Sequence, residues 1–567
     1  MRLKFSPARL LSQLLILCLV IGVAHQGGAV DCRDLSRSPD RLERLSDFPV
    51  LSPSARQSLA SGPKAVTTWE SRRRQGKPVL ALAISSFNLA MKEVETIENY
   101  LHYEHRALWN ILRARDPNVR VLFVSSDPVP KEAIDHMLES LPPEEGRAVR
   151  SRIDFVHVGD RRHVYLTDKI LDSPFLQAQI LLRGSKLLGE AVSGDNSLLF
   201  PYNVTPEVVQ MAKKLGVEFV GLSPVLTQLN SKSLNHDVFA STQVPHPKTF
   251  AHIKSQTILA GSVWRLFKED PELQSVFTKT NNGTSGQGIF DVTRKELKAE
   301  GYRDDMNRAE AIPIIIRVLR RKEQNDETWD EVMVRSQVDG AVVQEGIPHK
   351  RVPSAQLYVH ADGRVELLST HMQKIEDKAY VGSSYPAYPK DPQLQQKLES
   401  YAIELARTLA DYGVRGRIAF DFFEVSLKGR GKSTPRSDFV VGEANIREGG
   451  TTHSWEILNR LLETHHDPNL GVMVSEVTGK PVYYEMTDGY KTPWLETKST
   501  ADVFALINTH PVWRRLKFNR ETGEGIQLHM TEAIGEFGKV AYTASASTPE
   551  KAAALFKSME AFLRSLK

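Results

Sequence analysis

The sequence predicts an α/β protein: a Rossmann-like N-terminal domain of parallel strands, followed by a domain of more antiparallel character. In the first domain short apolar runs alternate with amphipathic stretches, at Val79–Ile84, Val119–Val124, Ile153–Val158 and Val217–Leu222. Buried strands that alternate with helices indicate a parallel sheet with crossover helices. Further on, the alternating segments Ser354–Val359 and Val365–Ser369 are joined by the turn Ala361–Arg364, which favours a hairpin.

The length of 567 residues is too great for one hydrophobic core, so more than one domain is expected. Helices are predicted at Glu93–Arg113 in the first domain and at Pro549–Leu566 at the C-terminus. The expected parts are a targeting segment (1–30), a linker or irregular arm (31–77), the N-terminal α/β domain (78–225) and the second domain (226–567).

Composition indicates a soluble globular protein, with 41% hydrophobic and 25% charged residues. The net charge of +4, from 73 basic and 69 acidic residues, gives no electrostatic reason to expect nucleic acid as a partner. The two cysteines, Cys18 and Cys32, both precede the folded body. Disulfides and cysteine-based metal sites are therefore excluded from that body.

The N-terminus has the features of a secretory signal peptide. Arg2, Lys4 and Arg9 precede the apolar run Leu10–Val23, and small residues follow at 27–29. The run is short for a membrane-spanning helix, which needs about 20 apolar residues, so no stable span is expected after processing. The first thirty residues also lack any acid, which leaves an organellar presequence open, and an N-terminal anchor remains a further alternative.

A lysine followed by a glycine-rich loop is the first segment with chemical meaning. Lys279 lies on the apolar strand that starts at Val276, and the loop after it contains Gly283, Gly286 and Gly288. Glycines let backbone N–H groups approach phosphate oxygens, and the lysine supplies a positive charge. The loop does not match the Walker A motif, and a plain glycine-rich hairpin is the alternative.

The apolar strand Ala341–Ile347 ends in the polar residues Gln344 and Glu345. Such a strand end can present backbone groups to the edge of an adenine ring, with the Glu345 carboxylate accepting from the exocyclic amine. Ordinary strand termination is the alternative interpretation.

Two apolar strands, Arg417–Phe423 and Val440–Arg447, each carry acidic or amide side chains. Asp421, Glu443 and Asn445 offer oxygen ligands, which suit Mg²⁺ bound together with substrate phosphates. Residues two apart on a strand face the same side, so Arg447 shares a face with Glu443 and can stabilise charge on a transferred phosphoryl group. A structural salt-bridge cluster is the alternative.

The order of these segments (lysine strand, glycine loop, strand 341–347, Asp strand, Glu-x-Asn-x-Arg strand) resembles the ATP-grasp superfamily. The resemblance narrows to peptide ligases of the pheganomycin type, which have a pre-ATP-grasp domain and a two-lobed α+β ATP-grasp domain. It rests on Tyr103–Arg106, Ser231–Ser233, Ser354–Val359, Leu368–Gln373, Tyr385–Ala387 and Asn445–His453. The most specific element is the Gly-Gly-Thr-Thr-His run at 449–453.

This resemblance implies an ATP- and Mg²⁺-dependent ligase that joins a carboxylate to an amine or peptide through an acyl phosphate. The implied phosphate- and adenine-binding residues are Lys232, Lys279, Gly283, Ser285, Gly286, Gly288, Gln344, Glu345 and Ile347. The implied metal ligands are Asp421, Glu443 and Asn445, and Arg447 and Lys279 would act in catalysis. Substrate contacts are implied for Gly449, Gly450, Thr451, Thr452 and His453.

Two other functions on the same fold remain open: an ATP-binding protein without catalysis, and an ATP-dependent phosphotransferase. The polar insert Ser426–Asp438 departs from the resemblance and is expected to form an exposed hairpin tip. The oligomeric state and the identity of the substrates stay open.

Two glycosylation sequons bear on the compartment, Asn203-Val204-Thr205 and Asn282-Gly283-Thr284. A glycan on Asn282 would obstruct the glycine loop, so an active enzyme is expected to be unmodified there. The sequon at Asn203 shows no such conflict in the sequence.

Overall fold

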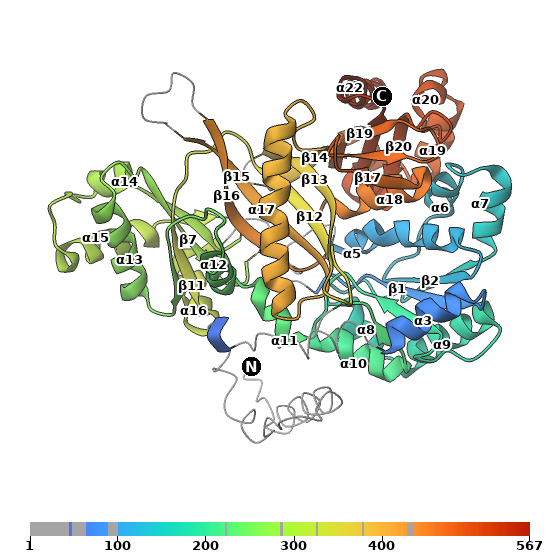
Figure 1. The fold of residues 1–567 in the computed structure, drawn as a ribbon, viewed down its shortest axis with the longest axis horizontal. Helices are drawn as coiled ribbons and strands as arrows, with labels where there is room; N and C mark the ends of the chain where they lie inside the picture. The colour runs from blue at the N-terminus through green and yellow to red at the C-terminus, as the bar shows by residue number, and fades with distance from the viewer. Residues whose placement is uncertain are drawn as a thin grey trace. The chain divides into compact units, whose positions relative to one another are not determined.

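The structure, a computed structural model, describes residues 45–47, 64–88, 94, 100–221, 224–283, 287–324, 327–376, 379–427 and 436–566. The chain divides into two compact units, residues 1–49 and 50–567. In the first unit the described part is the short helix η2 (Leu45–Asp47), so the expected targeting segment lies outside the described residues. The fold and the site belong to the second unit, whose colours run from blue to red in Figure 1.

The N-terminal part of this unit is built on a parallel sheet with strand order β3-β2-β1-β4-β5. Its strands are β1 (Val79–Ile84), β2 (Val119–Ser125), β3 (Ile153–His157), β4 (Ser197–Phe200) and β5 (Glu218–Phe219). Every neighbouring pair is parallel, which confirms the Rossmann-like architecture. Because β1 is buried along its whole length, both faces of the sheet are covered.

Helices cover the two faces of this sheet and form two separate cores. Leu80 and Leu82 of β1 pack with α8, α9 and α10, whereas Val79 and Ala81 pack with η3 and α6. The helices are α5 (Tyr100–Tyr103), η3 (Glu104–Arg115), α6 (Lys131–Leu138), α7 (Pro143–Arg150), α8 (Leu166–Leu171), α9 (Pro174–Leu188) and α10 (Pro206–Leu215). Much of the α-helix predicted at Glu93–Arg113 is thus the 3-10 helix η3, and residues 89–93 and 95–99 lie outside the described part.

Helix α3 (Lys64–Arg74) lies in the segment expected to be a linker or irregular arm. Its one large anchor is Trp69, which is 4% exposed and donates its indole N–H to the carbonyl oxygen of Leu80 at 3.1 Å. The remaining residues are mostly polar and give no sustained apolar period, which is why the sequence pattern did not predict the helix.

A four-stranded antiparallel sheet, in the order β6-β11-β7-β8, forms the small lobe after the parallel sheet. Its core lies between this sheet and helices α13 to α16, and it buries Phe290 and Trp329. The elements of this region are α11 (Pro224–Thr227), η4 (Gln228–Asn230), α12 (Lys232–Ala240), β6 (Thr249–Ile253), α13 (Gln256–Glu269), β7 (Ser275–Thr280), β8 (Ile289–Thr293), α14 (Arg294–Ala299), α15 (Arg308–Arg320), β9 (Glu323–Gln324), β10 (Glu327–Thr328), α16 (Trp329–Asp339) and β11 (Ala341–Glu345).

The large sheet is antiparallel and has the order β16-β15-β12-β13-β14-β19-β18-β17, with β21 beside β19 and β20 beside β21. Its strands are β12 (Pro353–Val359), β13 (Val365–Glu376), β14 (Ala379–Tyr385), β15 (Gly416–Leu427), β16 (Arg436–Asn445), β17 (Thr464–Asp467), β18 (Val472–Ser475), β19 (Pro481–Lys491), β20 (Gly525–His529) and β21 (Lys539–Ala546). The predicted hairpin is confirmed, because β12 and β13 pair and Gly363 supplies the positive φ of the turn. The tip of the predicted insert, residues 428–435, lies outside the described part.

Helices cover both faces of the large sheet. On one face the long helix α17 packs against β12 and β13, and Figure 1 shows it running in front of them. On the other face Ser454, at the start of α18, accepts a hydrogen bond from Thr543 of β21 at 2.9 Å. The remaining helices are α17 (Pro392–Asp411), α18 (Thr452–Leu462), η5 (Pro493–Thr497), α19 (Thr500–Thr509), α20 (Pro511–Leu516), η6 (Thr531–Ala533), α21 (Ile534–Phe537) and α22 (Pro549–Ser565). Helix α22 confirms the C-terminal helix predicted from the sequence.

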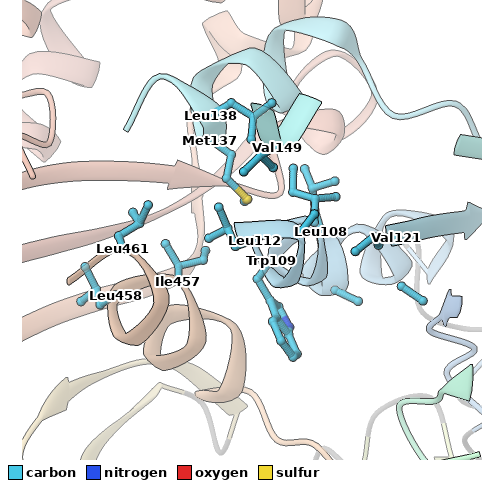
Figure 2. Packing of buried hydrophobic residues seen from close by; sticks show 14 of the residues in the cluster. Leu108, Trp109, Leu112, Val121, Met137, Leu138, Val149, Ile457, Leu458 and Leu461 are labelled. Carbon is cyan, nitrogen blue, oxygen red and sulfur yellow. The ribbon is translucent and has the colours of Figure 1, made fainter. Parts of the chain in front are cut away.

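The N-terminal domain and the large sheet share one hydrophobic core. Leu112 of η3 points toward Ile457 of α18 (Figure 2), and Leu108 and Trp109 of η3 belong to the same buried cluster. Trp109 is 1% exposed. This shared core joins the face of the parallel sheet that η3 covers to helix α18 and the large sheet.

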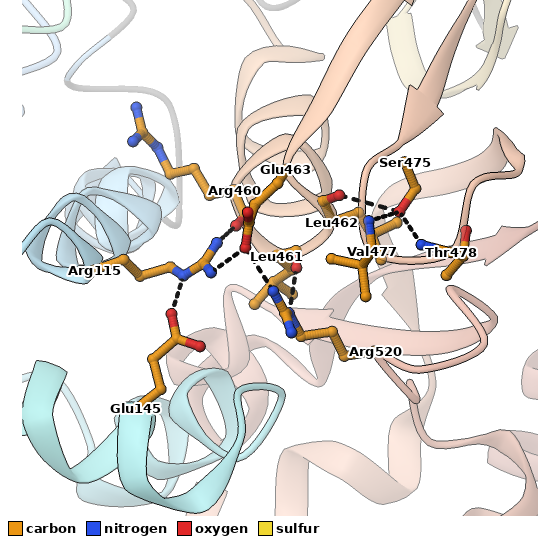
Figure 3. Close-up of polar contacts among 10 residues, drawn as sticks. All are labelled: Arg115, Glu145, Arg460, Leu461, Leu462, Glu463, Ser475, Val477, Thr478 and Arg520. Carbon is orange, nitrogen blue, oxygen red and sulfur yellow. Dashed lines mark hydrogen bonds and ion pairs between the residues drawn. The ribbon is translucent and has the colours of Figure 1, made fainter.

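Ion pairs border this core. Arg115 of η3 pairs with Glu145 of α7 and with Glu463 at the end of α18, and Arg520 also pairs with Glu463 (Figure 3). Arg115 donates a further hydrogen bond to the backbone oxygen of Arg460. The two domains are therefore held together by polar as well as apolar contacts, while the exact domain boundaries stay a prediction.

Candidate active site

Neighbouring strands of the large sheet carry the predicted metal ligands. In the β15–β16 ladder Asp421 lies opposite Glu443, and Ala419 lies opposite Asn445. Side chains two apart on a strand, and partners across a ladder, stand on the same face of a sheet. The register therefore places Asp421, Glu443 and Asn445 together on one face.

The Asp421 carboxylate is held by two amide side chains. It accepts a hydrogen bond from Gln373 Nε2 at 2.6 Å and another from Asn445 Nδ2 at 3.2 Å. Burial, and after it the charge of Glu443, raise the pKa of Asp421 to about 7. A carboxyl group with a raised pKa beside a second carboxylate gains most from a bound cation.

Lys232 reaches the same face from the start of α12. Ser231 caps this helix by accepting a hydrogen bond from the backbone N–H of Leu234, which fixes Lys232 in the first turn. The Lys232 ammonium lies 3.2 Å from Glu443 Oε1 and donates to the carbonyl oxygen of Gly283 at 2.6 Å. Burial opposes ionisation of Glu443, but the charges of Lys232 and Lys279 outweigh it and lower the pKa of Glu443.

Lys279 approaches from strand β7 of the small lobe. Its ammonium donates to Gln344 Oε1 at 2.7 Å, and Gln344 in turn donates to the Thr249 hydroxyl at 3.3 Å. Burial lowers the pKa of Lys279 to about 8; the charge of Glu443 opposes this shift, and the charge of Lys232 adds to it. The small lobe thus presents a half-buried cation toward the acidic face of the large sheet.

Of the other predicted adenine-site residues, Glu345 is engaged with the backbone. Its carboxylate accepts from the N–H of Lys248 at 2.8 Å, and its own N–H donates to the Lys248 carbonyl at 3.0 Å. Ile347 follows β11 and is half-buried. The cavity beside Lys232, Lys279 and Gln344 measures about 10 Å³, which is no more than about one water molecule occupies.

The glycine loop lies between β7 and β8, and its middle, with the predicted residues Ser285 and Gly286, lies outside the described residues. Gly288 has φ +65°, and an added Cβ would come within 2.3 Å of the Thr280 hydroxyl, so only glycine fits there. The N–H of Gly288 donates to the buried carboxylate of Glu327 at 3.1 Å. The described end of the loop is therefore anchored to the small lobe.

The donor set fits Mg²⁺ bound together with nucleotide phosphates. Within the described residues, no group of three or more His, Cys, Asp and Glu side chains could hold a metal ion. Asp421 and Glu443 with the Asn445 amide supply two carboxylates and one neutral oxygen, and Mg²⁺ is commonly bound through one or two carboxylates plus substrate phosphates.

Arg447 lies just beyond the end of β16 and is directed toward the N-terminal domain. Its guanidinium donates to the Tyr202 hydroxyl at 2.8 Å and to the carbonyl oxygen of Glu448 at 3.0 Å. The Arg447 charge also acts to lower the pKa values of Asp421 and Glu443, so it is electrostatically coupled to the acidic pair.

The 449–453 run turns from Arg447 into helix α18. Thr452 accepts from the Gly449 N–H at 2.9 Å and donates to Gln356 at 3.3 Å, while Gly450 packs closely on the Tyr380 ring. Thr451 precedes the helix. His453 is 2% exposed, with its ring 4.5 Å from that of His529, and burial holds its pKa well below the usual range. Thr452 and His453 are thus buried in the first turn, away from any open surface.

Three partners of the site were not predicted from the sequence: Gln373, Tyr202 and Glu327. Each contacts a predicted residue or loop. None of the three, however, is a polar residue inside an apolar run beside another motif, which is the pattern that predicted the other site residues. A pattern read along the chain has no signal for contacts that depend on strand register and domain packing.

No protein-family model matches this chain. A curated relative, the L-propargylglycine–L-glutamate ligase of Streptantibioticus cattleyicolor, is 23% identical over 497 residues, covering 85% of this chain and 93% of the relative. Solved structures similar to it include the ADP complex of an N5-carboxyaminoimidazole ribonucleotide synthetase (12% identity, 86% and 97% coverage, TM-score 0.46) and a biotin carboxylase from Campylobacter jejuni (14%, 84% and 89%, TM-score 0.48).

The similarity to a ligase over most of both chains confirms the resemblance to peptide-forming ligases that the motifs indicate. The succession of a parallel sheet and two antiparallel sheets confirms the predicted fold class. This chain is therefore related in sequence to a ligase of two amino acids, and it has the α/β architecture expected of an ATP-grasp enzyme.

Proposed function

We propose that this chain is an ATP- and Mg²⁺-dependent carboxylate–amine ligase that works through an acyl phosphate. The observation that carries the proposal is one cluster of two lysines and two carboxylates, contributed by four separate elements (α12, β7, β15 and β16). Lys232 and Lys279 lie beside Glu443, which stands opposite Asp421. Such a cluster has the charges needed for a polyphosphate with its cation.

In this proposal each residue has one role. Lys232 and Lys279 hold phosphate oxygens, and the backbone of the loop from Gly283 to Gly288 covers them. Asp421 and Glu443, with Asn445, hold Mg²⁺, which would supply charge neutralisation at the phosphates. Gln344 keeps the Lys279 ammonium in place, because it accepts its hydrogen bond.

The proposed reaction balances in two steps. Transfer of the γ-phosphoryl group to a carboxylate oxygen gives an acyl phosphate and ADP. The amine nitrogen then bonds to the carbonyl carbon, the carbon–oxygen bond to phosphate breaks, and phosphate and a proton leave. Arg447 supplies a positive charge at the edge of the acidic cluster, where the acyl phosphate would form.

The first experiment measures nucleotide binding by thermal unfolding. Mg-ATP at about 100 times its Kd should stabilise the protein by about 2.7 kcal/mol through mass action, which raises Tm by several degrees. An unchanged Tm at millimolar Mg-ATP would contradict the nucleotide site.

The second experiment measures ADP release with purified protein and a panel of amino acids and peptides. A ligase releases stoichiometric ADP only when a carboxylate and an amine are both present. Release with one acceptor alone would identify a phosphotransferase, and binding without any release would identify a nucleotide-binding protein without catalysis.

We also propose that residues 1–30 form a secretory signal peptide. In the part of the chain that the structure describes, no helix is long and apolar enough to cross a membrane. N-terminal sequencing of the protein from its native cell should find a new terminus near residue 30. An intact Met1 in the mature protein would contradict this, and residence in an organelle would favour the presequence.

A further inference from the structure

A cavity of about 290 Å³ lies where the N-terminal domain meets the large sheet. Phe200, Tyr202 and Arg113 line it from the N-terminal domain, and Tyr358 and Arg417 line it from the sheet. Its volume lies near the lower end of the range for small-molecule sites, which is roughly 300–1,000 Å³. None of these residues belongs to the phosphate or metal cluster.

The cavity shares the sheet face of the acidic pair. On β15, Arg417 and Asp421 are four residues apart, so their side chains stand on the same face roughly 13 Å apart along the strand. Tyr358 lies opposite Arg417 in the β12–β15 ladder. Arg447 lines the cavity too, and its charge acts on Asp421. The cavity and the proposed metal site are therefore two ends of one surface that meet at Arg447.

Positive charge is concentrated around this cavity. Arg417 and Arg460 both pair with the single buried carboxylate of Glu456. In Figure 3 the Arg460 side chain points away from the Arg115–Glu463 pair. Only the backbone oxygen of Arg460 contacts this pair, as the acceptor of a hydrogen bond from Arg115. Two guanidinium groups thus share one carboxylate on the cavity wall.

Arg113 is a third guanidinium, and it makes no ion pair with any described residue. Its Nε donates to the Asn110 side chain at 2.7 Å, and its plane lies 4.0 Å from the Phe200 ring centroid and 4.9 Å from that of Trp109. Burial, and after it the charge of Arg460, lower the pKa of Arg113 to about 9. A guanidinium that lines a cavity and has no ion-pair partner is suited to bind an anion.

Glu448 supplies the opposite charge in the same cavity. Its backbone is fixed, since its N–H donates to the Tyr202 carbonyl at 3.2 Å and its own carbonyl accepts from Arg447. Its carboxyl group makes no hydrogen bond or ion pair with the described residues, although it lines the cavity with Arg113. The cavity therefore contains one guanidinium and one carboxyl group that act on each other through space but make no direct ion pair with the described residues.

We propose that this cavity binds the amine substrate of the ligase as a zwitterionic α-amino acid, with its α-carboxylate on Arg113 and its α-ammonium on Glu448. The proposal rests on the proposed function and specifies its substrate class. Glu448 directly follows Arg447, so the nitrogen would lie at the end of the cavity where the acyl phosphate forms. The α-carboxylate, held on Arg113, takes no part in bond formation and would stay free in the product.

Binding of each proteinogenic L-amino acid, its α-carboxamide and its N-acetyl derivative tests this proposal. The full chain is saturated with Mg²⁺ and a non-hydrolysable ATP analogue, and affinity is measured by calorimetry. At least one free amino acid should bind about tenfold more tightly than both of its derivatives, because each derivative loses one charge-assisted contact.

Three variants locate the two contacts. Arg113→Met should weaken amino-acid binding about tenfold and abolish the preference over the carboxamide, whereas Arg113→Lys should keep part of it. Glu448→Gln, which preserves the shape of the side chain, should abolish the preference over the N-acetyl derivative. Arg115→Met is the matched control: it removes a guanidinium from the same helix, lowers Tm through its lost ion pairs, and leaves both preferences intact.

The outcomes separate this proposal from the proposed function. Wild-type protein that binds no free amino acid better than its carboxamide, or Arg113→Met protein that keeps the preference, would overturn the amino-acid site. In both cases the Tm shift with Mg-ATP would remain. Absence of that shift in the wild type would instead overturn the nucleotide site itself.

Discussion

Lys279 is half-buried and contacts Gln344 rather than a carboxylate, so its charge is available for a phosphate. We predict that Lys279→Ala lowers kcat/KM for ATP by about 100-fold or more, as loss of a preorganised charge does at other active sites. Tm should stay within a few degrees of the wild type, because the side chain fills no hydrophobic core.

The measurement is ADP release with thermal unfolding on the same samples. Lys248→Ala is the matched control, since Lys248 lies in the same lobe but pairs with Glu269 at the surface. Activity of the Lys279 variant within a few-fold of the control would remove Lys279 from the phosphate site.

Asp421 gives the site a pH dependence. Its pKa is raised to about 7 by burial and then by Glu443, whereas an aspartate in an unfolded chain ionises near about 4. Between these values the folded protein holds a proton that the unfolded chain has lost, so the free energy of unfolding falls as pH rises through this window. We predict that, without Mg²⁺, Asp421→Asn raises Tm relative to the wild type more at pH 8 than at pH 4.5.

The same variant should lose most of the Tm shift with Mg-ATP, because the amide cannot replace a carboxylate as a magnesium ligand. Melting curves at both pH values, with and without Mg-ATP, measure both the pH-dependent difference in Tm and the loss of the Tm shift with Mg-ATP. A Tm difference that does not change with pH would mean that Asp421 ionises normally in the folded protein.

Single site residues are predictable from the sequence where a polar side chain interrupts an apolar strand. Asp421, Glu443 and Lys279 are of this kind, and the structure places them close together. Gln373 is not, because it lies in the polar stretch that follows the predicted strand Val365–Ser369. The structure extends this strand, β13, to Glu376, since His371 and Gln373 have hydrogen-bond partners on other strands of the same sheet, Tyr484 and Asp421.

Among the elements, η3 carries the contact between the two domains. We predict that Trp109→Ala destabilises the protein by about 3–5 kcal/mol, as large-to-small substitutions of buried aromatic residues do. Urea unfolding measures this, with Phe175→Ala as the control because Phe175 is 70% exposed. A loss below about 1 kcal/mol would show that the shared core in Figure 2 contributes little.

Helices and strands made of long apolar runs are predictable from the sequence. Those that mix polar and apolar residues are less predictable. Strands β1 and β2 match the predicted runs almost residue for residue, since buried parallel strands are continuously apolar. Helix α3 was missed because Trp69 is its only large buried apolar side chain, and η3 has the apolar content of an α-helix but adopts 3-10 geometry.

At the scale of the whole molecule, the structure changes one expectation about glycosylation. The Asn203 side chain donates to the Asn88 carbonyl at 2.9 Å, accepts from its N–H at 3.3 Å, and lines the 290 Å³ cavity. A glycan on Asn203 would conflict with these contacts. The Asn203 sequon, which shows no such conflict in the sequence, is therefore not free to carry a glycan. Asn282 is exposed beside the glycine loop.

We therefore predict that active protein from its native cell carries no glycan at Asn203 or Asn282. Mass spectrometry of the two tryptic peptides, on protein that is shown to be active, measures this. Full occupancy at Asn282 with undiminished activity would contradict the role of the glycine loop. The packing of the N-terminal domain on α18, which creates the cavity beside Asn203, has no signal in the sequence because it joins segments far apart in the chain.

The contacts of Lys232 have a consequence for how nucleotide enters. One ammonium group joins the glycine loop, through Gly283, to Glu443 on the large sheet, and the cavity beside it measures about 10 Å³. A triphosphate is larger than that space, so in the proposed function Lys232 exchanges its carboxylate and carbonyl partners for phosphate oxygens. Nucleotide binding is thus a replacement of one set of ionic contacts by another, and its association rate would level off at high ATP concentration at the rate at which Lys232 releases Glu443.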